Sequence, residues 1–350
     1  ERSSGMVAAR VTCDTGDVHE YMHGLGWSDG LPLVPPSPAR VQWMLSGTDR
    51  LPDEVLGQCP PMYCDATVEK VAANAVMAGC APAHFRIVLA AVEAALQDCF
   101  NMHGVGATTM GATPVILVNG PVRHEAGLNF QHGALGSGSR ANGSIGRALK
   151  LVQQNIGGAK LGGTESTTIG TPMKWGMCVA EWEEAAPAWE PYHVTRGFNR
   201  GDSTVTVIAL TSGPNQLTDF RTRKSLQVCE LMAATMAVMY DKYMPLINDA
   251  LIVISPEHYH TLLRGGITSK HKLQCALWHL CNKELAPRII GVLLRAKPGV
   301  TGLVIGSILW LLSQACGVIT TLLVTLCPSC WQHLVPLHSA VFGKLVPKFE

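Results

Sequence analysis

A block of glycines, asparagines and isolated charged residues over positions 119–183 constrains the fold of this chain more than any other feature. It contains the phrases VNGP, LNFQHGALGSGSRANGSIGRALK, QQNIGGAKLGGTESTTIG and PMKWGMCVAEWEE. Glycine is favoured where the backbone takes positive φ or approaches a ligand closely, and Asn, Arg and His side chains supply directional hydrogen bonds. The block therefore predicts a loop-rich site for a polar ligand.

The segments around this block predict an α/β fold with a mixed sheet and flanking helices. Helical spacing predicts a hairpin of two helices over 66–96, with Gly79 ending the first and Pro82 starting the second. Strands are expected at 113–118, 176–181, 203–210 and 250–255, and helices at 39–45, 142–154, 224–240 and from 256 to about 294. We expect a single body over residues 1–297, wrapped by an irregular Gly/Pro-rich arm over residues 1–66.

The rest of the chain, residues 298–350, is predicted to be a charge-poor apolar tail. No Asp, Glu, Lys or Arg lies between Lys297 and Lys344. Its centre, 300–326, is long enough for a bilayer span of roughly 20 residues, so membrane association through it stays open. A buried helix followed by a strand is favoured, because β-branched residues follow Gly317. The next phrase, Cys327-Pro-Ser-Cys330, has dithiol spacing, but too little chain follows it for a thioredoxin-like fold.

Composition excludes some classes of protein. The 350 residues are 47% hydrophobic, which allows a substantial core. A net charge of +1 argues against a nucleic-acid partner, because such binding needs a basic surface. Twelve scattered cysteines do not suit a small disulfide scaffold and predict a reducing intracellular compartment, either cytoplasm or an organelle. The chain opens with Glu-Arg-Ser-Ser and shows no readable signal peptide, so we expect a processed or incomplete product.

Several long phrases carry a resemblance to a known family. GWSDGLPLVPPSPARV, TVEKVAANAVMAGC and SRANGSIGRALKL resemble a bacterial family marked by GWTDGLPVVPPT, VEKVAINAVMAGC and RANATIGRALRL, over residues 27–278. Members of that family accompany proteins with a cysteine- or selenocysteine-Gly-Ser-Cys motif, so the resemblance implies thiol redox chemistry. The chain departs from the family in QHGALGSG around His132, at Trp175, where the family has Tyr, and in the tail, where only 338–342 resembles the family's Gly-Gly-Lys-His-Ser turn. These departures leave open the alternative that this chain is a relative that has kept ligand binding but lost catalysis.

Cysteine and histidine side chains are the candidate catalytic groups. Cys80 and Cys178 are candidate nucleophiles or a redox pair if a cation or a helix N-terminus lowers their thiol pKa, and are otherwise small buried hydrophobes. His103 and His132 lie beside glycines and are candidate general bases. No HExxH or paired CxxC spacing predicts a metal site, and GxGxxG is absent in a strand-turn-helix setting, so a nicotinamide cofactor is not supported. The cofactor is left unknown.

The candidate substrate-binding groups centre on the start of the helix at 142–154. A guanidinium offers a bidentate fork and a helix start offers free N–H groups, which suits a small carboxylate or phosphate. The alternative is that Arg140 and Arg147 pair with Glu165, Glu181 or Glu183 and fix the glycine loops. The candidate binding set is Asn119, Asn129, Arg140, Asn142, Arg147, Lys174 and Glu181.

Two functions are consistent with these patterns. The first is an enzyme, either a lyase or a thiol-linked oxidoreductase, that acts on a small anionic or thiol-bearing substrate. The second is a non-enzymatic, membrane-docked accessory subunit of a larger protein assembly, built on an enzyme-like fold. The charge-poor tail motivates the second function.

Overall fold

The computed structural model describes residues 8, 11–13, 16–239, 250–293 and 340–345. We expected one body over residues 1–297, whereas contacts between residues group the chain into two compact units. The first unit takes its described residues from Glu1–Glu183, Pro191–Pro214 and Pro336–Glu350. The second takes them from Glu184–Glu190 and Asn215–Val335. The run 300–326 and the Cys327–Cys330 phrase lie outside the described residues.

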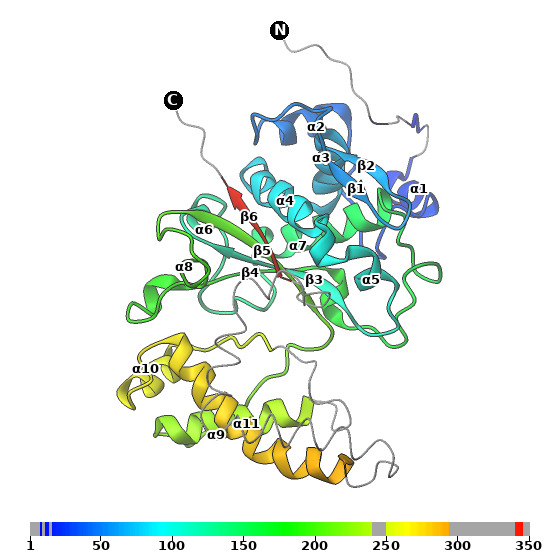
Figure 1. Ribbon diagram of the computed structural model, residues 1–350. Coiled ribbons are helices and arrows are strands. Elements are labelled where there is room, and N and C mark those ends of the chain that lie inside the picture. Colours follow the sequence, from blue (N-terminus) through cyan, green and yellow to red (C-terminus); the bar gives the residue numbers. More distant parts are fainter. Residues whose placement is uncertain (1–7, 9–10, 14–15, 240–249, 294–339, 346–350) are drawn as a thin grey trace. The chain divides into compact units, whose positions relative to one another are not determined.

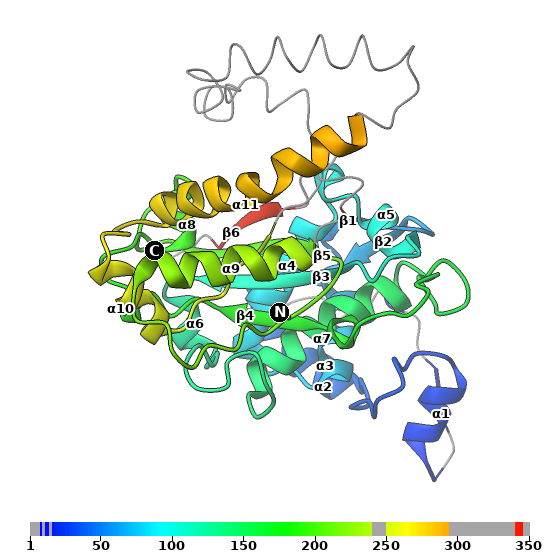
Figure 2. The ribbon, with the colours of Figure 1, turned by 90° about the horizontal axis from the view of Figure 1, so that it is seen from below.

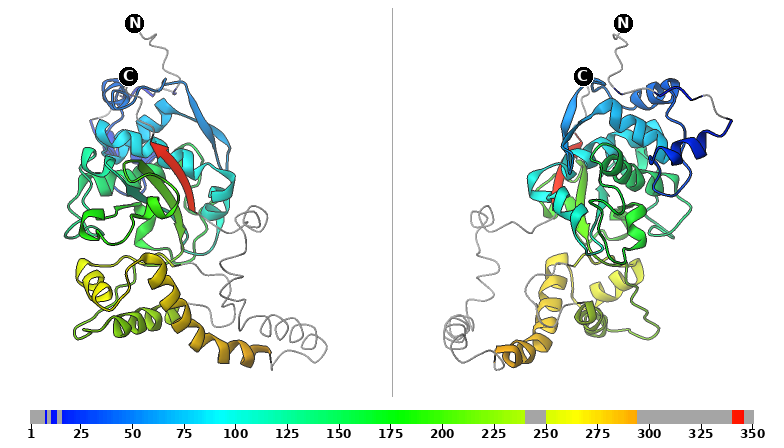
Figure 3. Two further views of the ribbon diagram at one scale, coloured as in Figure 1. Left: turned by 60° about the vertical axis from the view of Figure 1, so that its left-hand side comes forward. Right: turned by 90° about the vertical axis from the view of Figure 1, so that its right-hand side faces the viewer.

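A four-stranded mixed sheet forms the centre of the first unit and confirms the α/β fold (Figure 1). Its strand order is β4 (Met177–Ala180), β3 (Thr113–Asn119), β5 (Ser203–Leu210) and β6 (Ala340–Leu345). Strands β3 and β4 are parallel, and β5 is antiparallel to both β3 and β6. All seven residues of β3 are buried, as expected for a central strand with an unbroken apolar run. Figure 3 shows β6, from the end of the chain, beside β5.

Helices α4 (Pro82–Ala95) and α7 (Arg140–Asn155) pack against the sheet, and α3 (Val68–Ala78) packs on both of them (Figure 1). The predicted helical hairpin is confirmed, because Gly79 ends α3 with a φ of 89° and Pro82 begins α4. The helix predicted at 142–154 is also confirmed as α7. Most of its buried apolar residues recur at the helical period that places them on one face, namely Ala141, Ile145, Ala148, Leu149 and Val152, whereas Leu151 is buried to one side of that face.

Two glycines bring α7 close to the start of β4. A Cβ atom on Gly146 would lie 2.4 Å from the backbone nitrogen of Met177. A Cβ atom on Gly176, whose φ is 114°, would lie 2.3 Å from the backbone nitrogen of Arg147. No side chain fits at either position, so these glycines set the distance between helix and strand.

The N-terminal arm contains more regular structure than its prolines and glycines predict. It carries α1 (Val18–Gly24), α2 (Pro38–Leu45) and a hairpin of β1 (Val55–Cys59) and β2 (Cys64–Thr67), seen in Figure 3. Helix α2 confirms the helix expected at 39–45, whereas the hairpin was not predicted. Shorter elements complete the first unit: η1 (Asp98–Phe100), α5 (Met102–Ala107), α6 (Val122–Glu125), η2 (Pro172–Trp175) and α8 (Tyr192–Thr195).

The second unit contains three longer helices, α9 (Ser225–Met239), α10 (Pro256–Arg264) and α11 (Lys270–Leu293) (Figure 2). Along the chain, the first unit ends and the second begins within η3 (Glu183–Ala185). Trp189 lies in its core, where its ring meets that of Tyr259 edge to face and its Nε1 donates to the Ile267 carbonyl at 3.1 Å. The strand predicted at 250–255 is wrong. Residues 250–255 have no regular secondary structure, and Ser255 caps α10 through its side chain. Among the described helices, none combines the length and hydropathy needed to cross a bilayer.

Candidate functional site

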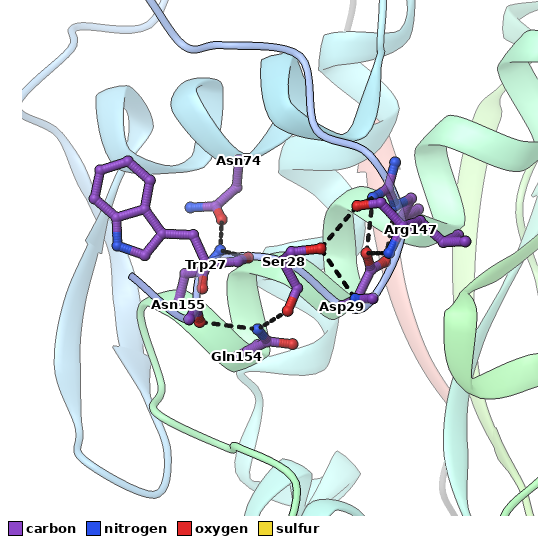
Figure 4. A network of polar contacts seen from close by, with 10 residues as sticks. Trp27, Ser28, Asp29, Asn74, Arg147, Gln154 and Asn155 are labelled. Atoms are coloured by element: carbon purple, nitrogen blue, oxygen red, sulfur yellow. Dashed lines mark hydrogen bonds and ion pairs between the residues drawn. The ribbon is translucent and has the colours of Figure 1, made fainter. Parts of the chain in front are cut away.

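Arg147 is held by the N-terminal arm. Its Nε and Nη2 donate to the two carboxylate oxygens of Asp29 at 2.8 and 2.7 Å, and Nη2 also donates to the Leu31 carbonyl at 3.1 Å. Figure 4 shows this bidentate pair beside further bonds from Gln154 and Asn155 to the backbone of the arm. The predicted pinning role is therefore the better description of Arg147, with Asp29 as partner in place of Glu165, Glu181 or Glu183.

Arg140 also contacts the protein's own backbone. Its Nε donates to the Gly79 carbonyl at 2.8 Å, and its Nη2 donates to the Cys80 carbonyl at 3.1 Å. These contacts satisfy carbonyl groups at the end of α3, where a helix leaves acceptors without partners. The guanidinium thus serves the turn between α3 and α4, and not the start of α7 where we expected an anion.

Asn142 and Asn129 form a reciprocal contact that closes the glycine-rich loop before α7. The Asn142 Oδ1 accepts the Asn129 N–H at 2.8 Å, and its Nδ2 donates to the Asn129 carbonyl at 2.9 Å. Ser139 caps α7 and donates its hydroxyl to the same Oδ1 at 2.6 Å. The Asn129 side chain donates to the His132 carbonyl at 2.9 Å. These hydrogen bonds show that the polar residues of the loop hold the loop in its own conformation.

The two candidate thiols lie in the core. Cys80 and Cys178 are each 2% exposed. Burial raises the pKa of Cys80 to about 12, although Ser144, Arg140 and Arg147 act in the opposite direction. Burial, assisted by the nearby Cys80, raises the pKa of Cys178. These environments match the expected alternative of small buried hydrophobes better than that of reactive thiolates.

The candidate histidines occupy separate, exposed positions. His103 lies on α5 and meets the Tyr63 ring edge to face at 6.2 Å. His132 is exposed in the loop before α7, where its carbonyl accepts from Asn129. The buried histidine next to Cys80 is His84, whose Nδ1 accepts the Ala81 N–H at 3.1 Å. Burial, followed by the charge of Arg140, lowers the pKa of His84.

Asn119 and Glu181 do meet, at the carboxyl ends of the parallel strands β3 and β4. The Asn119 Nδ2 donates to the Glu181 Oε2 at 2.6 Å and to the Glu183 Oε1 at 3.1 Å. The same Glu181 oxygen accepts the Tyr192 N–H at 2.7 Å. Carboxyl ends of parallel strands are common ligand positions, but here the carboxylates already accept internal donors.

Arg123 completes this carboxylate cluster. Its Nη2 lies 3.2 Å from the Glu183 Oε2, its Nη1 donates to the Glu181 carbonyl at 2.6 Å, and its side chain is 3% exposed. Glu183 is 9% exposed and its Oε1 lies 3.9 Å from Nδ1 of the buried His193. The cluster joins the strand ends to α8 and offers little exposed surface to a ligand.

A second charged cluster lies near the amino ends of β3 and β4. The Lys174 Nζ donates to the Glu165 Oε1 at 2.7 Å and to the carbonyl of Ala112, the residue before β3, at 3.1 Å. The Lys150 Nζ lies 3.9 Å from the Glu165 Oε2 and donates to the Gln153 Oε1 at 2.7 Å. We call Lys150, Glu165 and Lys174 the lysine–glutamate cluster. Its side chains are 13, 11 and 17% exposed in that order, so they are shielded but not sealed.

Burial and charge shift the pKa values of Lys150 and Glu165 in this cluster. Burial, with a smaller effect of Lys174, lowers the pKa of Lys150 to about 8, while Glu165 pulls in the opposite direction. Burial would raise the pKa of the Glu165 carboxyl, but bonds from Lys174 and the Thr167 hydroxyl outweigh it and lower that pKa. The cluster therefore holds an ionised carboxylate beside an amine whose pKa is lowered to about 8.

Of these three residues, only Lys174 is among the predicted binding groups. Lys150 was missed, and Glu165 was expected only as a partner for arginine. A charge count offers the missing signal. Glu165 is the sole acidic residue between Glu125 and Glu181, a span that contains Arg140, Arg147, Lys150, Lys160 and Lys174. Because Arg147 binds the arm and Arg140 binds the end of α3, the single carboxylate of Glu165 is available to the lysines.

Among the described residues, no group of three His, Cys, Asp or Glu side chains is arranged to hold a metal ion. No family model, curated protein or solved structure matches this chain. The resemblance to the bacterial GWTDGLP family thus stays a prediction. Within the structure, two of its phrases meet, because GWSDGLP binds α7 of SRANGSIGRALK through Asp29 and Arg147 (Figure 4).

Proposed function

We propose that this chain is an enzyme of the lyase type, which removes a proton from a small anionic substrate at the lysine–glutamate cluster. Lys150 is the base, Lys174 supplies positive charge for the substrate, and Glu165 orients Lys174. The observation that carries the proposal is the shielded Lys150 amine, which shares the Glu165 carboxylate with Lys174 and whose pKa burial lowers to about 8. A base is most effective when its pKa lies near the working pH.

The charge of the cluster supports an anionic substrate. Two lysines face one carboxylate, so the cluster carries a net positive charge whenever Lys150 is protonated and is neutral when Lys150 is free to accept a proton. In the proposed step, a C–H bond next to a substrate carboxylate or carbonyl breaks, and its proton moves to the Lys150 Nζ. The electron pair stays on the substrate as an enolate, whose oxygen Lys174 stabilises. The enolate then expels a leaving group from the neighbouring carbon with its bonding electrons, and the new C=C bond completes the elimination.

The position of Glu165 in an exposed loop also supports this site. Glu165 lies in a loop between Lys160 and Lys174 whose residues Leu161 and Ile169 are 85 and 97% exposed. Thr168 attaches this loop to the Thr109 carbonyl through its N–H and its hydroxyl. The cluster thus borders solvent through a loop, which is where binding groups commonly lie.

Thiol-linked oxidoreduction at Cys80 and Cys178 is the less favoured reaction, because both thiols are buried and their pKa values are raised. The accessory-subunit hypothesis depends on residues 300–326, which lie outside the described residues. Location in a reducing compartment remains part of the proposal.

Hydrogen–deuterium exchange tests the proposed step. The protein would be mixed in heavy water with a panel of short 2-oxo and 2-hydroxy carboxylic acids, and loss of the proton signal next to the carboxylate or carbonyl would be followed by NMR. We expect exchange of at least one acid above the protein-free rate, and its loss in Lys150→Met. Lys160→Met is the matched control, because Lys160 is an exposed lysine of the adjoining loop. Equal exchange by wild type and Lys150→Met would contradict the role of Lys150.

A further inference from the structure

The β1–β2 hairpin places two cysteines directly opposite each other. Cys59 ends β1, Cys64 begins β2, and the antiparallel register pairs them across the hairpin. Opposed residues in antiparallel strands have Cα atoms roughly 4.5–5.5 Å apart. Disulfides join residues whose Cα atoms lie about 4.4–6.8 Å apart, so this pair can form a bond without a large backbone movement. Both cysteines are free thiols in the structure.

The two thiols differ in access. Cys59 is 0% exposed, and its Sγ lies 3.8 Å from the Val152 carbonyl on α7. Burial, and then the nearby Cys64, raises the pKa of Cys59 to about 12. Cys64 is partly exposed on the other strand. A dissolved oxidant therefore meets Cys64 first, and Cys59 is placed to react only afterwards.

Other cysteines of the described structure do not combine these properties. Cys80 and Cys178 are both buried, so neither gives a dissolved oxidant an entry point. Cys99 is exposed, but it lies in η1 and has no cross-strand register with another cysteine. It provides an internal control for simple modification of an accessible thiol.

The hairpin tip also contacts the segment that leads to the lysine–glutamate cluster. The Met62 N–H donates to the Gly157 carbonyl at 3.0 Å. The Met62 side chain occupies the space where a Cβ on Gly158 would lie, 2.4 Å from its Sδ. Gly157 and Gly158 follow α7 and precede the loop that carries Glu165. A covalent bond across the hairpin would thus stiffen a support of that loop.

We propose that Cys59 and Cys64 form a reversible disulfide by exchange with small oxidised disulfides such as glutathione disulfide. The Cys64 thiol loses its proton to solvent, and its sulfur attacks one glutathione sulfur, which breaks the glutathione S–S bond and releases one glutathione thiolate. The Cys59 thiol then loses its proton to solvent and attacks the Cys64 sulfur, which releases the second glutathione. The protein thiols lose two electrons in total, and glutathione disulfide gains them. The proposal does not depend on the function of Lys150.

Peptide mapping under non-reducing conditions tests this modification. Full-length protein would be incubated with glutathione disulfide in its folded state, and linked and glutathione-bearing peptides would be identified by mass spectrometry. We expect a Cys59–Cys64 linkage, with two glutathione molecules released for each linkage and full reversal by dithiothreitol. Cys99 should carry at most a mixed disulfide with glutathione.

Two variants separate the steps. Cys59→Ser should accumulate glutathione on Cys64, because the second attack is lost. Cys64→Ser should leave Cys59 unmodified while the protein stays folded, as checked by circular dichroism. Wild-type protein that keeps glutathione on Cys64 without a Cys59–Cys64 linkage would overturn the proposal. So would modification of Cys59 in the folded Cys64→Ser variant at the rate seen for Cys99.

Discussion

Replacing Lys150 with methionine should change how stability depends on pH. Lysine normally has a pKa of 10.5, and burial lowers that of Lys150 to about 8 in the folded chain. The difference corresponds to roughly 3 kcal/mol of unfavourable free energy when the amine is protonated in both states. Lys150→Met removes this cost, which the wild type bears in full below about pH 8.

The sign follows from proton binding. Between about pH 8 and 10.5 the unfolded chain holds a proton on Lys150 that the folded chain has released. Stability rises with pH wherever the unfolded state binds more protons, so wild type should gain about 3 kcal/mol relative to Lys150→Met across this window. At neutral pH the variant also leaves the buried Gln153 oxygen without its donor, which costs about 1–3 kcal/mol and offsets part of its gain. The change with pH is unaffected by that offset.

Urea unfolding, followed by circular dichroism at a series of pH values, measures this change. The free energy of unfolding of Lys150→Met minus that of wild type should be highest near neutral pH and fall through the window above pH 8. Lys160→Met is the control, because it removes an exposed lysine of the adjoining loop. A Lys150→Met difference that varies with pH no more than that of Lys160→Met would refute the reasoning.

Two further predictions concern packing and charge, both measured by urea unfolding. Gly146→Ala should lower the free energy of unfolding by about 1–3 kcal/mol, because its Cβ would meet the backbone of β4. Gly143→Ala, with open space around it on the same helix, should raise it by up to about 1 kcal/mol. Equal effects of the two variants would contradict the close packing. Asp29→Ala should cost about 3 kcal/mol because it leaves the shielded Arg147 charge without its carboxylate, whereas Glu93→Gln at a more exposed pair should cost less than about 1 kcal/mol. A similar small cost for both would contradict the pinning role of Arg147.

Local patterns in the sequence predicted the longer helices and three of the four strands of the central sheet, β3, β4 and β5. The apolar period of α7, and the Gly79 and Pro82 signals between α3 and α4, depend on residues close together in the chain. The strand predicted at 250–255 failed because a short apolar run does not reveal whether a neighbouring strand is available. The β1–β2 hairpin turns through Pro60 and Pro61, whose turn signal hid the strands on either side.

Side-chain partners were harder to predict than elements. Arg147 and Asp29 are 118 residues apart, and Arg140 contacts a carbonyl 61 residues away, so no local spacing signals either pair. We predicted that the guanidinium groups of Arg140 and Arg147 bind an anion at α7. In the structure both groups instead bind acceptors of the protein itself. Asn119 and Glu181 do lie together, because β3 and β4 are parallel and their carboxyl ends lie side by side. The low pKa of Lys150 depends on burial, which one sequence does not show.

Competitive acetylation measures the property of Lys150 on which the proposed function depends. Folded protein would be treated with trace acetic anhydride at a series of pH values, and the labelling of Lys150 and Lys160 would be quantified separately by peptide mass spectrometry. Only the neutral amine reacts, so the midpoint of each pH profile reports the pKa of that lysine. We predict a midpoint near pH 8 for Lys150. A midpoint near the ordinary lysine value of 10.5, with the protein still folded, would contradict its role as a base.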